Sequence, residues 1–314
     1  MAILNETKFS RELIKQLYPE NSFYTKGKVD FNQNDAKTIK YPVAATIGSA
    51  KTGSPSLPLS IETFTDGQDE YTTEQVYAGP VLINNEQEML TNYSIFQDRV
   101  SQLAQTLNTK IANLAAYQWG PTKSDRIALT TGTDTRTTSL TGSASGARKR
   151  ITKSDIIKIY TAMKKDNMGP GNNTIYGLFT PEMYEDLLLI DDFIDYEKTG
   201  QVNNLKRGIV GRILGIEIMM RWDEDSGSAG LWYSQAKAKK DNTTDPAAND
   251  GAAALFFKAG AVRYSRAKKV DTSINRKAAG YLGGTIIENW TRFGGAISRQ
   301  DDEKGVFALV EAKT

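Results

Sequence analysis

Apolar residues recur at intervals of three and four between residues 85 and 119 and predict one long amphipathic helix. The stripe comprises Met89, Tyr93, Phe96, Val100, Leu103, Leu107, Ile111 and Leu114. Asn85 with Glu88 is typical of a capping box, and Gly120-Pro121 ends the pattern. About 33 helical residues make a rod of about 50 Å. Because the stripe is narrow and the other positions are polar, we expect the rod to lie across a surface.

Two shorter helices are predicted from their start signals. Thr152 with Asp155 resembles a capping box, and the helix that it opens closes at Gly169-Pro170. Thr180-Pro181-Glu182 supplies an N-cap, a proline at the first helical position and an early acid. The expected apolar faces comprise Ile156, Ile159, Tyr160 and Met163, and then Met183, Tyr184, Leu187, Leu188 and Ile190.

Short β-rich runs are interspersed with these helices. Thr38–Val43 and residues 60–64 are strand-like, and the Gly-, Ser- and Pro-rich stretch between them predicts an exposed hairpin tip. A two-stranded projection is unstable alone, so it needs a surface to lie against. Residues 124–147, dense in Thr, Ser and Gly, predict a flexible loop or an extended ribbon. Further strands are expected at residues 71–83, 175–179, 213–220, 253–257, 261–264, 285–290 and 305–310.

The composition narrows the possible functions mainly by what it lacks. The 314 residues contain neither cysteine nor histidine, which excludes disulfides, zinc–cysteine sites and histidine bases and argues against catalysis. The net charge of +2 is too balanced for a dedicated nucleic-acid binder, although it leaves room for local basic patches. There is no run of 18 apolar residues and no secretory signal. We therefore expect a soluble chain that stays in a cytoplasm-like space.

Two motifs resemble ligand-binding loops, but their spacing is wrong. The glycines at 208, 211 and 215 match neither phosphate-binding pattern and lead into a strand-like run, so they indicate backbone turning. Asp223-Glu224-Asp225 fails the calcium-loop spacing because Ser228 stands where glycine belongs. We expect a solvated acidic turn there and no metal site.

Clusters of like charge are further candidates for sites. Basic residues at 148–150, at 237, 239 and 240, and at 266, 268 and 269 could contact phosphates, but aromatic residues for base stacking are missing apart from Tyr264. Solvated faces or salt bridges between subunits explain them equally well. The acid pairs at 191–192 and 301–302 lie in polar loops that fix no pocket. We therefore expect no catalytic site and no cofactor.

Several passages together carry a resemblance to a known family. They are FSRELIKQLYPENSF at 9–23, FTPEMYEDLLLIDD at 179–192, GIVGRILGIEIMM at 208–220, and residues 261–309, which end in GVFAL. In this order, over essentially the whole chain, they resemble the major capsid proteins of tailed bacteriophages with the Hong Kong 97 type of fold. That fold is α+β. The resemblance implies an N-terminal arm (1–36), an extended β-hairpin loop (37–84), a spine helix with the first part of a peripheral domain (85–151), an axial domain (152–284) and returning peripheral strands (285–314).

The resemblance also implies a structural function and no enzymatic one. Many copies would form hexamers and pentamers of an icosahedral shell around double-stranded DNA, in a virion assembled in the host cytoplasm. Scaffolding, portal and decoration proteins are implied partners, with non-specific DNA contact and no membrane. Because the arm follows Met1 at once, we expect separate scaffolding or none. The alternatives are an encapsulin-like shell with protein cargo and a carboxylate- or tyrosine-dependent α+β enzyme.

Assembly contacts are expected in three places. The arm presents an apolar face, and the hairpin tip carries a lysine, for which we predict no covalent cross-link. The polar loop from residue 191 to 207 is the candidate for contacts around a capsomer axis. The candidate residues are Phe9, Leu13, Lys51, Asp191, Asp192, Lys206 and Arg207.

Overall fold

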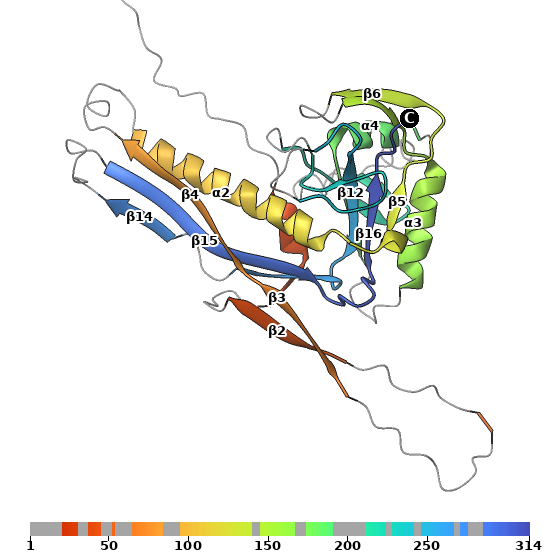
Figure 1. The fold of residues 1–314 in the computed structure, drawn as a ribbon, viewed down its shortest axis with the longest axis horizontal. Helices are drawn as coiled ribbons and strands as arrows, with labels where there is room; N and C mark the ends of the chain where they lie inside the picture. Colours follow the sequence, from red (N-terminus) through yellow and green to blue (C-terminus); the bar gives the residue numbers. More distant parts are fainter. Residues whose placement is uncertain are drawn as a thin grey trace, which may run out of the picture.

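The computed structural model describes residues 21–30, 37–44, 52–53, 65–83, 95–139, 145–166, 174–190, 211–223, 228–241, 246–266, 271–275 and 285–314. These residues mix helices and sheets, as the α+β prediction requires (Figure 1). In chain order the elements are η1 (Ser22–Lys26), β1 (Lys28–Val29), β2 (Thr38–Val43), β3 (Gly67–Thr72), β4 (Glu74–Ile83), α2 (Ile95–Trp119), η2 (Ser124–Arg126), β5 (Ile127–Leu129), β6 (Thr135–Ser139), β7 (Ser145–Lys149), α3 (Lys153–Lys165), β8 (Ile175–Phe179), α4 (Pro181–Leu188), β9 (Gly211–Ile213), β10 (Ile216–Met220), β11 (Trp232–Tyr233), β12 (Gly251–Lys258), β13 (Val262–Arg266), β14 (Asp271–Asn275), β15 (Thr285–Ile297) and β16 (Val306–Val310).

Two sheets form the body of the protein. One has the order β5-β16-β12-β8-β10-β9, with β11 paired to β12. All eight residues of β12 are buried, because α3 and α4 cover one face of this sheet and a second core covers the other. The other sheet has the order β1-β13-β15-β14, with β4 on the opposite side of β15. The helix α2 lies along β4 and β15 of this second sheet (Figure 1).

The long helix ends where the sequence predicts, at Trp119. The predicted start at Asn85 and Glu88 lies outside the described residues, as do Met89 and Tyr93. The buried stripe is narrow at first and then widens to include Ala112, Ala115 and Ala116, so the expectation of a narrow stripe holds only for the first turns. Within the described residues, no helix combines the length and apolarity needed to cross a bilayer.

The hairpin differs from its predicted pairing. The strand β2 pairs with β3, from Thr38 opposite Thr72 to Val43 opposite Gly67, whereas residues 60–64 lie outside the described residues. The expected partner was therefore wrong for residues 38–43. The sequence of β3, GQDEYT, carries only Tyr71 as an apolar anchor, so its local strand signal is weak. The predicted run 71–83 is likewise divided at Thr73, between the hairpin and the sheet.

Local signals elsewhere predict the structure correctly. Thr152 and Asp155 form the capping box of α3, and the Thr180 hydroxyl accepts a hydrogen bond from the backbone of Met183 at the start of α4. The stretch 124–147 overlaps the ribbon β6–β7, which extends to Lys149, and this selects the ribbon alternative. The expected single run 213–220 was wrong, because Leu214 and Gly215 adopt positive φ angles of 48° and 81° and turn the chain from β9 into β10.

Candidate functional site

The predicted assembly residues all lie outside the described residues, so their roles stay predictions. They are Phe9, Leu13, Lys51, Asp191, Asp192, Lys206 and Arg207. The sites that the structure does describe are the base of the hairpin and a buried cluster of charges beneath the ribbon β6–β7.

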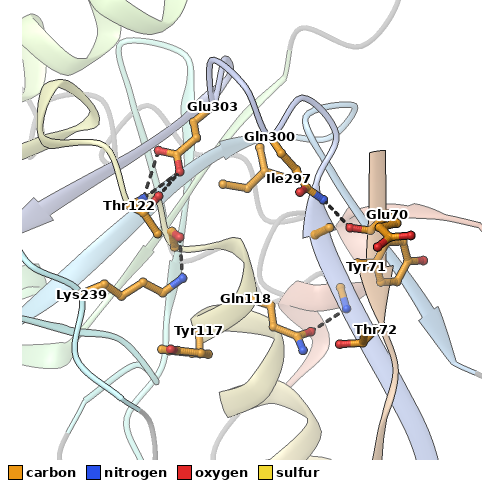
Figure 2. Close-up of a pocket in the computed structure, with 13 residues that line it drawn as sticks. Glu70, Tyr71, Thr72, Tyr117, Gln118, Thr122, Lys239, Ile297, Gln300 and Glu303 are labelled. Atoms are coloured by element: carbon orange, nitrogen blue, oxygen red, sulfur yellow. Dashed lines mark hydrogen bonds between the residues drawn. The ribbon is translucent and has the colours of Figure 1, made fainter. Parts of the chain in front are cut away.

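A cleft of about 530 Å³ lies between the base of the hairpin and the body (Figure 2). The strand β3 lines one side, and the rest is lined by the end of α2 with the residues after it, the end of β15, the segment before β16 and Lys239 after β11. The lining comprises Glu70, Tyr71, Thr72, Tyr117, Gln118, Gly120, Thr122, Lys239, Gly295, Ala296, Ile297, Gln300 and Glu303.

Gln300 holds the hairpin at the edge of this cleft. Its side-chain amide donates to the Glu70 carbonyl at 2.9 Å and to the Tyr41 hydroxyl at 3.2 Å. The Tyr41 hydroxyl in turn donates to the Ile297 carbonyl at 3.0 Å, and the Arg263 guanidinium lies 3.7 Å from the centre of the Tyr41 ring. These contacts fix the direction in which β2 and β3 leave the body (Figure 1).

The ionisable groups of the cleft are engaged in structural contacts. The Glu303 carboxylate accepts hydrogen bonds from the backbone N–H groups of Thr122 and Lys123, at 2.9–3.0 Å. The Lys239 ammonium donates to the Gly120 carbonyl at 2.7 Å and lies 4.4 Å from the centre of the Tyr117 ring. Burial lowers the pKa of Lys239 to about 8, against the opposing pull of Glu303. These groups brace the end of α2 and are not arranged as a nucleophile beside a base.

The second site is a buried cluster of charges centred on Arg136 of β6. Its guanidinium donates to Glu182 at 2.9 Å, to Asp186 at 3.3 Å and to Glu311. Asp186 also accepts from the backbone N–H of Ile151 at 3.1 Å. The cluster therefore ties the ribbon to α4 and to the chain after β16. Sequence reasoning missed it, although Arg136 is the only basic residue between Arg126 and Arg148 in a stretch of Thr, Ser and Gly.

The basic cluster at residues 148–150 is partly buried and engaged in contacts within the chain. Arg148 is fully buried and donates to the backbone carbonyls of Ala248, at 3.2 Å, and Asp250, at 3.0 Å. Arg150 pairs with Asp186 at 3.0 Å. The interpretation of Arg148 as a phosphate or subunit contact was therefore wrong, because its guanidinium is buried and hydrogen-bonded inside the chain.

The acidic run at 223–225 has a structural partner at its first residue. The Asp223 carboxylate accepts a hydrogen bond from the Asn113 amide at 2.6 Å, and the residue is buried, which corrects the expectation of a solvated turn at this position. Residues 224–227 are not described. Within the described ranges, no group of three acidic side chains is placed to hold a metal ion.

Glu311 should make stability depend on pH. Burial raises its pKa to about 7 from an ordinary value of 4.5, and burial also raises the pKa of Asp186. Between pH 4.5 and 7 the native state thus binds more protons than the unfolded state. The free energy of unfolding should therefore fall as the pH rises from about 4.5 to 7. Glu311→Gln keeps an acceptor for Arg136 and should flatten this slope, leaving the part due to Asp186. Urea unfolding midpoints of the unassembled chain at a series of pH values measure it, and equal slopes would contradict the assignment.

Comparison with solved structures identifies the fold of the chain. No protein-family model and no curated protein matches the chain. Among solved structures, the chain is similar to the capsid of cyanophage P-SCSP1u, with 16% identity and a TM-score of 0.66 over 99% of this chain and 94% of that one. It is also similar to the capsid of Ralstonia phage GP4, with 14% identity and a TM-score of 0.63 over 99% and 96%. The capsid of a native GTA particle matches with 12% identity and a TM-score of 0.63, also over 99% and 96%. The chain therefore has the α+β capsid fold of the Hong Kong 97 type that the sequence predicted.

Proposed function

We propose that the chain is the major capsid protein of a tailed bacteriophage, and that many copies assemble into the icosahedral shell around packaged double-stranded DNA. The observation that carries the proposal is the end-to-end correspondence with phage capsid chains, which covers 99% of this chain and 94–96% of theirs. No large part of the sequence is left over for a separate activity. In the cleft, the Glu303 and Lys239 side chains are engaged in contacts with the backbone, which supports a structural role over an enzymatic one.

The surface of the isolated chain supports assembly. Tyr77 and Leu189 are 73% and 62% exposed, and the described hairpin β2–β3 is a projecting two-stranded ribbon (Figure 1). The ribbon is the stronger indication, because a two-stranded projection is only marginally stable in water unless another protein surface covers it. The predicted contacts of the arm, the hairpin tip and the loop 191–207 belong to this proposal. So do the hexamers and pentamers, the portal, scaffolding and decoration partners, and assembly in the host cytoplasm.

Electron microscopy and sedimentation of the purified chain test the proposal. We expect closed shells of uniform size. Discrete small species at every concentration would contradict it. Shells that enclose a specific protein and no DNA, when isolated from the natural source, would favour the encapsulin-like alternative.

Replacing Tyr77 should impair assembly with little effect on the fold. Tyr77 lies opposite Trp290 on the face of the second sheet that points away from α2. If a neighbouring copy buries the ring, Tyr77→Ser should weaken each contact by about 1.5–3 kcal/mol and raise the assembly threshold about tenfold or more. Tyr77→Phe, which keeps the ring, is the matched control. Light scattering against concentration measures the threshold, and an unchanged threshold in Tyr77→Ser would remove this face from the interface.

A further inference from the structure

The exposed face of α3 is basic along its whole length. Positions 156, 159 and 163 point into the core beneath the helix. The opposite face carries four lysines together with Ser154, Ile157 and Thr161, and it contains no acid. The lysines are Lys153, Lys158, Lys164 and Lys165, all of them exposed. At 3.6 residues per turn these positions fall on one side of the helix, so the charges share one surface.

This concentration of charge contrasts with the balanced charge of the whole chain and with the neighbouring helix. The whole chain carries a net charge of only +2, and the neighbouring helix α4 is acidic, with Glu182, Glu185 and Asp186. Those acids are directed to Arg136 and Arg150 rather than to α3. Among the described residues, no carboxylate pairs with the ammonium groups of Lys158, Lys164 or Lys165.

We infer that this surface, the α3 lysine face, binds the phosphate backbone of double-stranded DNA and therefore faces the interior of the shell. The inference rests on the proposed function, which supplies a duplex as the enclosed polyanion. From Lys153 to Lys165 the helix rises about 18 Å. Over that length a duplex presents about ten phosphate charges, at one per 1.7 Å or so. Several lysines can therefore reach phosphates at the same time.

The chemistry of the face favours sequence-independent contact. Lysine is a flexible point charge without the bidentate geometry that reads bases, and no exposed aromatic residue lies among the four for stacking. Such a face releases counterions on binding and makes affinity strongly dependent on salt. A face of this kind can hold any packaged sequence, whereas the fully buried Arg148 cannot take part.

The test compares two sets of four neutralising changes. The first set is Lys153→Gln, Lys158→Gln, Lys164→Gln and Lys165→Gln. The matched control removes four exposed charges elsewhere, with Lys28→Gln, Lys37→Gln, Arg99→Gln and Lys110→Gln. Glutamine keeps good helix propensity at the helical positions, and Lys28 and Lys37 are exposed outside helices, so both sets should fold. Binding of the unassembled chain to a fluorescent DNA duplex of mixed sequence is measured across a series of salt concentrations.

Removal of the α3 lysines should reduce the salt slope of the affinity by about 0.9 for each phosphate that the variant no longer neutralises. If all four lysines reach phosphates in the wild type, the ratio of wild-type to variant affinity should be about 100-fold larger at about 50 mM salt than at about 200 mM. The control set should keep most of the slope. Equal losses in both sets, or no loss in the first, would overturn the inference. Tighter binding of the lysine face to polyglutamate than to DNA would overturn it in favour of an acidic protein partner.

Shell formation is scored separately by electron microscopy. Absence of wild-type shells would count against the proposed function, even if the lysine face binds DNA. Wild-type shells together with DNA binding that ignores the α3 changes would leave the proposed function standing and remove only this inference. When shells form in cells, the α3 variant should also retain less DNA than the control set, measured as nucleic acid per particle.

Discussion

Trp119→Ala is expected to lower the free energy of unfolding by about 3–5 kcal/mol, the usual cost of removing a large aromatic side chain from a well-packed core. The Trp119 side chain is fully buried at the end of α2. Its ring lies 6.0 Å from that of Phe23 and 5.3 Å from that of Phe257, measured between centroids. Its indole N–H donates to the Arg263 carbonyl at 3.1 Å. One side chain thus joins η1, the long helix and both sheets.

The effect should be large because the site cannot collapse easily. A Cβ at Gly27 would already lie 2.8 Å from the Trp119 ring, so the chain packs against the ring without slack. Trp119→Phe is the matched control, since it keeps an aromatic ring and loses the hydrogen bond and part of the volume, and its cost should be clearly smaller. Chemical denaturation of the unassembled chain measures both variants. A loss below about 1 kcal/mol in Trp119→Ala would show that these contacts do not hold the two sheets together.

The features predicted correctly from the sequence are those with a local physical cause. A capping residue acts within one helical turn, so Thr152 and Thr180 mark the starts of α3 and α4 without knowledge of the fold. The strand β12 was likewise recognisable from its continuous apolar run, which is typical of a strand buried on both faces. The order of such signals along the chain carried the resemblance from which the fold was predicted.

The features that were missed depend on contacts between distant residues. The pairing of β2 with β3 is fixed by the cluster of Ile39, Tyr41 and Tyr71 against Ala296, which lies more than 200 positions further along the chain. Arg148 looked like a surface charge because its partners, the carbonyls of Ala248 and Asp250, give no sequence signal.

The candidate sites also differ in whether they depend on local sequence or on contacts between distant residues. Arg136 finds its acids on α4 and after β16, so only the folded chain could reveal the cluster. The α3 lysine face, in contrast, could have been found by reading the lysines against the helical period of Ile156, Ile159 and Met163.

Arg136→Met should be about as damaging as the loss of Trp119, for an electrostatic reason. The substitution leaves Glu182, Asp186 and Glu311 near one another around an apolar side chain. Asp186 and Glu311 are completely buried, and removing one partner of a buried ion pair typically costs about 3–5 kcal/mol. The matched control is Arg299→Met. Because Arg299 pairs with Asp302 at the surface, its loss should cost less than about 1 kcal/mol.

The pH dependence separates this charge effect from a simple loss of packing. Without Arg136, which lowers the pKa of both Asp186 and Glu311, these pKa values should rise further above their ordinary range. The unpaired acids would then take up protons as the pH falls, so the cost of Arg136→Met should be largest near pH 8 and shrink toward pH 5. Adding Glu311→Gln should recover part of the loss at pH 8, since it removes one of the stranded charges. A cost that is the same at both pH values, with no recovery in the double variant, would mean that Arg136 acts through packing and that the ribbon β6–β7 is not held by charge.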